Sequence, residues 1–106
     1  MQFIETTIFT KHLYSYLSEE EYCEMQNFLI EQPDAGDLIQ GTGGLRKLRW
    51  SSGNKGKRGG IRVIYYWQVS AEMIYLMTLY AKNEASDLSA KDKKLLQQML
   101  KGSEIS

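Results

Sequence analysis

The sequence has one histidine, one cysteine and one proline among its 106 residues. A single histidine, His12, excludes a nuclease that uses two histidines as general acid and general base. No Cys/His cluster with the spacing of a metal site is present, and the lone Cys23 cannot form a disulfide within the chain. Because no His or Lys lies near Cys23 in the sequence, we expect it to be buried and inert. The sequence therefore predicts neither a metal nor a cofactor.

Long apolar runs are also missing. The longest one extends from Met73 to Ala81, about half of the ~20 residues that a membrane helix needs. No charged and then apolar leader precedes Phe3. Together with the lone cysteine, these absences predict a cytoplasmic protein that has no contact with a membrane.

Acidic residues are absent between Leu38 and Ala71, although the whole chain holds 13 acidic and 13 basic residues. The stretch from Leu45 to Arg62 contains seven of the basic residues, and most acidic residues lie in residues 1–44. The net charge of zero therefore hides a dipolar molecule, whose basic part is suited to bind phosphate groups.

The length and the apolar patterns predict one domain, residues 1–106, of the α+β class. A short strand at residues 2–5 precedes two helices, of which the second begins with a capping box of Ser18 and Glu21 and ends before Pro33. The loop that follows, residues 33–44, is rich in glycine. It lacks the Lys-Ser/Thr end of a nucleotide-binding loop, so a plain turn is favoured over a phosphate-binding loop.

Three strands are predicted next, at 45–50, 61–69 and 73–81, because apolar residues alternate along the first and cover both faces of the second. Ser89 and Asp92 begin a last helix. We expect a small curved antiparallel sheet in the order β-α-α-β-β-β-α, with the helices packed on one face. The inward residues of the last helix are predicted to be Leu95, Leu96, Met99 and Leu100.

Basic residues lie on three neighbouring strands of this predicted sheet. Lys47 and Arg49 share the polar face of the first strand, Arg62 begins the second, and Lys82 follows the third. Taken alone, such a set is more typical of a solvated or generally phosphate-contacting face. The more specific interpretation is RNA cleavage by the ribose 2′-hydroxyl, in which cations stabilise a pentacoordinate phosphate without a metal. The neighbouring aromatic residues could stack on bases but are more typical of a core, namely Tyr65, Tyr66, Trp67 and Tyr80.

Three segments in this order resemble the HigB-like branch of the RelE superfamily of toxins. They are Gly43–Arg49 (GGLRKLR), Gly59–Tyr66 (GGIRVIYY) and Leu79–Glu84 (LYAKNE). The resemblance covers nearly the whole chain and implies a RelE-like fold and a type II toxin that cleaves messenger RNA on the ribosome. It also implies a helix-turn-helix antitoxin (HigA-like) that neutralises the toxin, with operator DNA bound only through the toxin–antitoxin complex.

Carried over residue by residue, the resemblance implies catalytic roles for Lys47, Arg49, Arg62 and Lys82, with Arg62 as the arginine that holds the scissile phosphate. The sequence departs from RelE at Ser89, where RelE has its C-terminal tyrosine, and at Leu45, where RelE has a lysine. Asn83 stands in place of a RelE arginine. Further contacts to RNA are expected from Arg46, Lys55, Lys57, Arg58 and Asn83.

Two other functions remain open from the sequence. A non-catalytic module that binds RNA or the ribosome and stalls translation explains the same charge pattern, and it suits the departures from RelE. A DNA-binding regulator that acts alone is less favoured, because no predicted helix has a basic recognition face.

Overall fold

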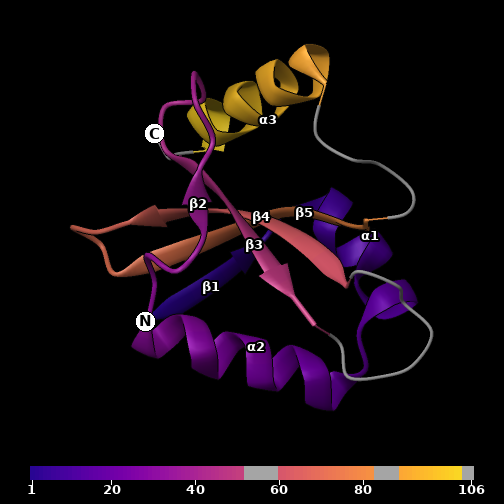
Figure 1. Ribbon diagram of the computed structural model, residues 1–106. Helices are drawn as coiled ribbons and strands as arrows, with labels where there is room; N and C mark the ends of the chain where they lie inside the picture. Colours follow the sequence, from indigo (N-terminus) through magenta and orange to yellow (C-terminus); the bar gives the residue numbers. More distant parts are fainter. Residues whose placement is uncertain (52–59, 83–88, 104–106) are drawn as a thin grey trace.

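The computed structural model describes residues 1–51, 60–82 and 89–103. In these parts of the chain, a five-stranded sheet lies between helices on both of its sides (Figure 1). The predicted α+β class and the order of the predicted elements are confirmed, and a two-residue strand, β2, is added in the loop after the second helix. The elements are β1 (Gln2–Glu5), α1 (Thr7–Tyr16), α2 (Glu19–Glu31), β2 (Asp37–Leu38), β3 (Leu45–Trp50), β4 (Ile61–Gln68), β5 (Met73–Ala81) and α3 (Ala90–Ser103).

The sheet has the strand order β1-β5-β4-β3-β2 and is mixed. Strands β2 to β5 pair antiparallel, whereas β1 runs parallel to β5, so the prediction of an antiparallel sheet is wrong for β1. Thr6 attaches the end of β1 to β5. Its hydroxyl donates to the carbonyl oxygen of Met77 in β5 at 2.7 Å and accepts the amide of Phe9 at 3.0 Å. The end of β1 and the start of α1 are therefore both fixed to β5.

One face of the sheet is covered by α1 and α2, which form the larger core with it. Phe9 and Leu13 of α1 and Met25 and Leu29 of α2 are almost completely buried there. The two residues of each helix are four positions apart, as on one face of an amphipathic helix, so each helix buries one stripe. We call this side of the sheet, which also carries Leu48 of β3, the α1/α2 face.

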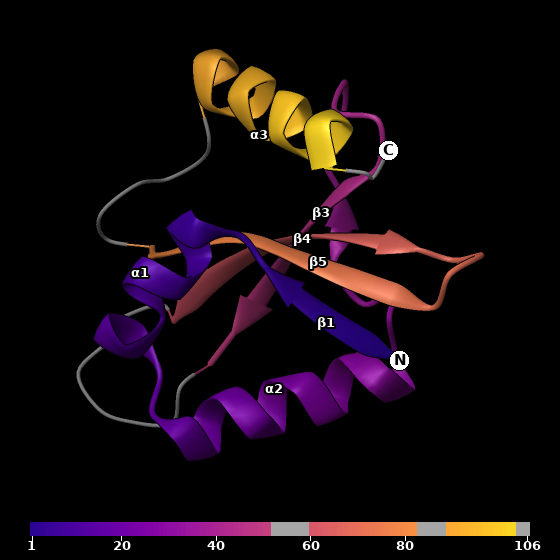
Figure 2. The same ribbon diagram turned by 180° about the vertical axis from the view of Figure 1, so that it is seen from behind.

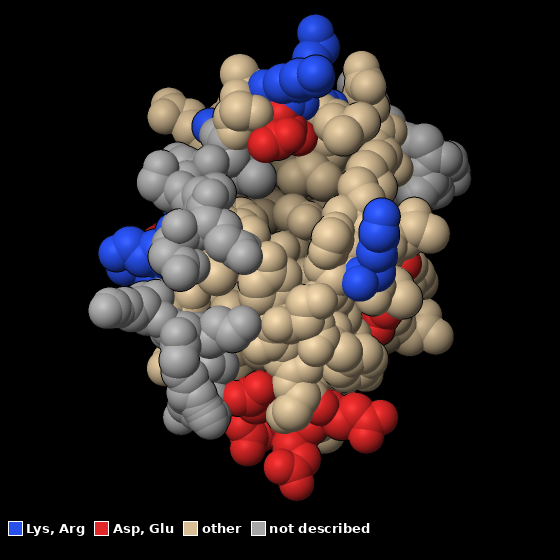
Figure 3. Space-filling model, turned by 90° about the vertical axis from the view of Figure 1, so that its right-hand side faces the viewer, with Lys and Arg blue, Asp and Glu red and all other residues tan. Residues whose placement is uncertain are grey.

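The start of α2 concentrates negative charge at one end of the molecule. The predicted capping box is present, because the Ser18 hydroxyl accepts the amide of Glu21 at 3.1 Å and the Ser18 amide donates to the Glu21 carboxylate at 2.9 Å. The first turn also contains Glu19 and Glu20, whose charge favours the positive end of the helix. On the side of the molecule drawn in Figure 3, Asp and Glu gather mainly at one end, and the visible Lys and Arg lie elsewhere.

The opposite face of the sheet is covered by α3 (Figures 1 and 2). Leu96 of α3 is 3% exposed and packs against Leu45, Ile64 and Met77. The prediction that all helices pack on one face is therefore wrong. The physical reason lies in β4, whose Ile64 and Tyr66 make the second face apolar as well, so that face also needs cover. We call this side the α3 face.

Two expectations for single residues are also wrong. Leu95 was expected to face inward but is 49% exposed. Leu96 occupies the centre of the apolar stripe, and adjacent residues on a helix point about 100° apart, so Leu95 points away from the sheet. Cys23 was expected to be buried but is exposed on α2. Within the described ranges, no helix is both long enough and apolar enough to span a bilayer.

The buried hydroxyl of Tyr65 ties the loop before β2 to the centre of the sheet. It donates to the carbonyl oxygen of Pro33 at 2.7 Å and accepts the amide of Gly36 at 2.9 Å. Burial raises the pKa of Tyr65, although the Gly36 amide acts in the opposite direction. At Tyr22, burial and then the hydrogen bond to Glu5 raise the pKa in the same way. These two hydroxyls attach the loop and β1 to the α1/α2 face.

Replacing Tyr65 by phenylalanine should lower the free energy of unfolding by about 1–3 kcal/mol, because two buried backbone groups lose their partner. Urea denaturation at pH 7 measures this loss. Tyr14→Phe is the control, since Tyr14 is 59% exposed. Equal unfolding midpoints for the two variants would contradict the structural role of the Tyr65 hydroxyl.

The same hydroxyl predicts how stability changes at high pH. Because the folded pKa of Tyr65 is raised, the unfolded chain loses this proton first, at about pH 10. The stabilisation is therefore complete below that pH and is lost as the pH rises above it. The decline should be shallower in Tyr65→Phe than in wild type, as measured by urea denaturation between about pH 9 and 11.

Candidate active site

The register of the sheet brings three of the predicted catalytic residues together. Arg49 of β3 is directly opposite Arg62 of β4, and Lys47 is directly opposite Ile64 on the same pair of strands. Directly opposed residues lie on the same face, and residues two apart along a strand also share a face. Lys47, Arg49 and Arg62 therefore all lie on the α3 face, and we call them the basic cluster.

The three side chains of the basic cluster differ in how exposed they are to solvent. Arg62 is 7% exposed, Lys47 is half-buried, and Arg49 is exposed. Like charges directly opposite each other destabilise a strand pair, and burying a guanidinium is unfavourable in itself. Several cations held on one face of neighbouring strands are typical of a surface that binds an anion. A bound phosphate would reverse the sign of the interaction, because an arginine offers a bidentate fork to its oxygens.

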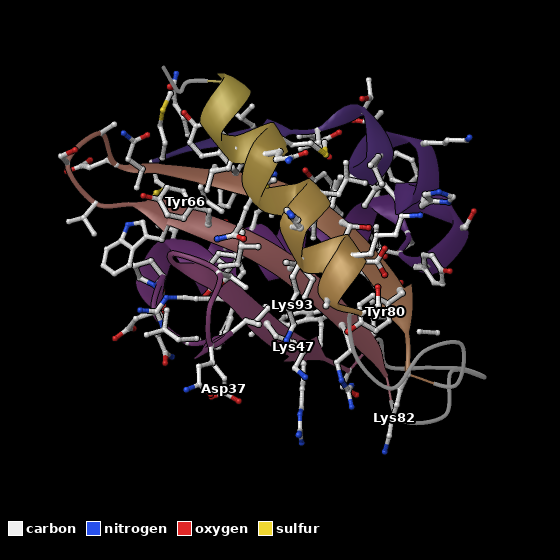
Figure 4. The ribbon with its side chains drawn as sticks, turned by 90° about the horizontal axis from the view of Figure 1, so that it is seen from above. Asp37, Lys47, Tyr66, Tyr80, Lys82 and Lys93 are labelled. Atoms are coloured by element: carbon white, nitrogen blue, oxygen red, sulfur yellow. The ribbon has the colours of Figure 1, made fainter. Side chains whose placement is uncertain are left out.

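Lys82 lies at the border of this cluster and not inside it. The backbone amide of Lys82 donates to the carbonyl oxygen of Gly60 at 3.2 Å. Gly60 directly precedes β4, so Lys82 lies beside the start of the strand that carries Arg62. Its side chain is exposed, and in Figure 4 it points outward from the end of β5, away from Lys47 and Tyr80. Lys82 is therefore positioned to contact an extended ligand that leaves the cluster.

Arg46 lies on the other face of the sheet. Its guanidinium donates to the carbonyl oxygens of Gly36 at 2.8 Å and Asp34 at 3.2 Å, so it fastens the loop between α2 and β2. The alternation of side chains along β3 separates it from Lys47 and Arg49. The structure thus does not bring Arg46 together with the basic cluster.

Four of the residues that we expected to contact RNA lie outside the described residues. They are Lys55, Lys57, Arg58 and Asn83.

Two further residues of the α3 face border the basic cluster, and neither was predicted as a site residue from the sequence. Tyr80 of β5 is directly opposite Arg62, and Asp37 of β2 is directly opposite Lys47. The first was recognisable only as an aromatic strand residue, for which a core position is the more typical role. Asp37 was hidden because β2 is only two residues long and falls in a loop pattern.

The side chains at this site favour phosphate chemistry based on charge. Among residues 1–51, 60–82 and 89–103, no three His, Cys, Asp or Glu side chains gather in a way that could hold a metal ion. The basic cluster instead offers two guanidinium groups and one ammonium group on adjacent strands. Groups of this kind stabilise the charge that develops on a phosphate during transfer.

The fold and the site define a small α+β domain that presents a basic cluster on the sheet face beneath its C-terminal helix. Comparison with protein families gives a match over residues 3–104 to the RelE toxin of the RelE/RelB toxin–antitoxin system. The chain belongs to the RelE family of toxins.

Comparison with solved structures supports the fold. The chain is similar to the E. coli toxin RelE, solved in the free state as a double arginine-to-alanine mutant. The two share 13% sequence identity and superpose with a TM-score of 0.57, over 80% of this chain and 86% of the E. coli protein. At this level of identity the likeness establishes the RelE-like fold.

Proposed function

We propose that the protein is the ribosome-dependent messenger RNA endoribonuclease of a type II toxin–antitoxin pair, of the HigB-like branch. The observation that carries this proposal is the direct pairing of Arg49 and Arg62 across β3 and β4, with Lys47 on the same face. Membership of the RelE toxin family supports it. The cleavage inhibits translation in the cytoplasm, where messenger RNA is translated.

In the proposed reaction, the ribose 2′-oxygen loses its proton and attacks the adjacent phosphorus, and the bond from phosphorus to the 5′-oxygen breaks. The leaving 5′-oxygen takes up a proton, so the products are a 2′,3′-cyclic phosphate and a 5′-hydroxyl. Arg62 holds the scissile phosphate, and Lys47 and Arg49 stabilise the negative charge of the pentacoordinate state without a metal.

RNA on either side of the scissile phosphate extends beyond the basic cluster. Lys82 lies at its border and contacts this flanking RNA, together with Lys55, Lys57, Arg58 and Asn83. The lysine and arginine contacts are electrostatic and Asn83 contributes hydrogen bonds, so contacts of this kind to the RNA backbone add affinity without selecting a sequence. Arg46 is not part of this proposed set, because its guanidinium binds loop carbonyls on the α1/α2 face.

The ribosome supplies the position of the substrate. Holding a messenger in one geometry removes the entropic barrier that a free RNA would present. Naked RNA is therefore a poor substrate. A helix-turn-helix antitoxin (HigA-like) neutralises the toxin, and only the complex of the two binds operator DNA.

The second candidate function is a non-catalytic module that binds RNA or the ribosome. It is favoured by the role of Ser89, which stands where RelE has a tyrosine. The Ser89 hydroxyl accepts the amide of Asp92 at 3.1 Å and so serves to begin α3. A protein of this kind arrests growth and leaves transcripts intact.

The two functions are separated by a pair of reporter transcripts that differ only in the start codon. On induction of the protein, the translated transcript should acquire new 5′ ends in the reading frame, and the transcript without a start codon should stay intact. Primer extension maps these ends. Equal cleavage of both transcripts would contradict ribosome dependence, and intact transcripts with arrested growth would favour the binding module.

A further inference from the structure

Lys93 is turned toward the sheet by the phase of α3. It lies one helical turn before Leu96, whose side chain is buried against Leu45 and Ile64 on the α3 face. Residues three apart on a helix share a face, so Lys93 points in the same direction as Leu96. Its burial agrees with this, because Lys93 is half-buried whereas Lys91 and Lys94 are exposed.

The direction of α3 then brings Lys93 over the basic cluster. Toward its end, Met99 and Leu100 pack in the same cluster as Tyr66, which is opposite Leu45. The start of the helix therefore lies over the other end of the strands, where Lys47 and Arg62 are found. Figure 4, which looks down on α3 from above, agrees with this direction, since Lys93, Lys47 and Tyr80 all fall near the first part of the helix and Tyr66 falls near its later part.

This position for a lysine is unfavourable for the fold. The start of a helix carries a partial positive charge, which disfavours a cation in the first turns. Lys47 and Arg62 of the basic cluster are positive as well, so the cations of the sheet face another cation from α3. An anion between α3 and the sheet would turn each of these repulsions into an attraction.

We infer that Lys93 is a further phosphate-contacting residue, which closes the basic cluster from the helix side. The ligand is a phosphodiester of the messenger RNA, held by Arg62 from the sheet and by the Lys93 ammonium group from α3. This inference rests on the proposed function. It assigns to α3 a direct part in the site, in addition to its role of covering the sheet.

The test compares variants of one helix in single-turnover cleavage by ribosomes that carry a defined messenger RNA. Lys93→Ala and Lys93→Met should cleave roughly 10- to 100-fold more slowly than wild type, since each removes one preorganised donor. Lys93→Arg should recover part of the rate because the cation is restored. Lys94→Ala removes the same charge from the exposed side of α3 and should cleave as wild type does.

A second measurement distinguishes contact with RNA from a loss of structure. With a messenger whose 2′-oxygens are methylated, so that it binds but is not cleaved, Kd is measured over a range of salt. Loss of one phosphate contact should reduce the slope of log Kd against log salt by about 0.7. Lys93→Met keeps the apolar stem and removes the repulsion between cations, so its Tm should equal or exceed that of wild type.

The outcomes separate the inference from the proposed function. If wild type cleaves and Lys93→Met has the rate and the salt slope of Lys94→Ala, the inference is wrong and the proposed function stands. If wild type does not cleave at all, the proposed function fails. An unchanged salt slope in Lys93→Met would then still overturn the inference, and a reduced slope would support it.

Discussion

Replacing Arg62 by alanine should lower the single-turnover rate of messenger RNA cleavage by at least about 10²-fold. Arg62 is the most buried member of the basic cluster, at 7% exposed, and its strand is fixed on both sides by direct pairing with Arg49 and Tyr80. A cation that is held in place and shielded from water stabilises a developing charge more strongly than a mobile one at the surface. Arg62→Lys should retain only part of the rate, because an ammonium group lacks the bidentate fork.

Arg46→Ala is the matched control for this variant. It removes the same charge from the same sheet, but from the α1/α2 face, where the guanidinium donates to Gly36 and Asp34. We expect a cleavage rate close to that of wild type and a loss of about 1 kcal/mol in the free energy of unfolding. A loss of cleavage as large as that of Arg62→Ala would mean that the substrate does not bind on the α3 face.

Replacing Leu96 by alanine should weaken the packing of α3 on the sheet by about 2–5 kcal/mol of free energy. Leu96 is 3% exposed and packs against Leu45, Ile64 and Met77. The larger core on the α1/α2 face does not include Leu96. Hydrogen exchange should therefore become faster in the backbone amides of α3 and change little in α2. Cleavage should also slow, because Lys93 no longer stays over the basic cluster.

Leu95→Ala is the control for the helix. It deletes the same atoms from the neighbouring position, which is 49% exposed, so exchange and cleavage should change little. Faster cleavage by Leu96→Ala than by wild type would contradict the role given to α3, since it would mean that the helix obstructs the site. Equal exchange in the two variants would contradict the packing of α3.

Side-chain alternation made the basic cluster predictable from the sequence. Along β3, Leu48 and Trp50 occupy one face, so Lys47 and Arg49 must share the other. Arg62 was predicted to lie near them because the apolar pattern of β4 begins at Ile61, which places Arg62 at the start of the neighbouring strand. A period of two residues determines which side chains share a face, whatever the rest of the fold is.

The direction of β1, the side taken by α3 and the strand β2 could not be predicted in this way. The pattern of a four-residue strand does not show in which direction it pairs, and the contact of Thr6 with β5 is visible only in the folded chain. For α3, the apolar stripe around Leu96 indicates burial but not the face on which the helix packs. Lys93 was recognisable from its spacing to Leu96 only once that face was known.

Arg46 illustrates the opposite difficulty. Its charge and its position beside Lys47 suggested an RNA contact, and the sequence contains no sign of the carbonyl groups that it binds. Those groups belong to Asp34 and Gly36, which the Tyr65 hydroxyl helps to hold in place from the middle of the sheet. A role that depends on a loop conformation is thus visible only in the folded chain.

Primer extension on cellular transcripts tests most directly whether the basic cluster cleaves translated messenger RNA. Wild type and Arg62→Ala are induced side by side, and 5′ ends are mapped shortly afterwards. We predict new in-frame 5′ ends with wild type and none with Arg62→Ala at equal protein levels. Identical ends with both proteins would contradict the assignment of the site, and intact transcripts with wild type would contradict cleavage itself.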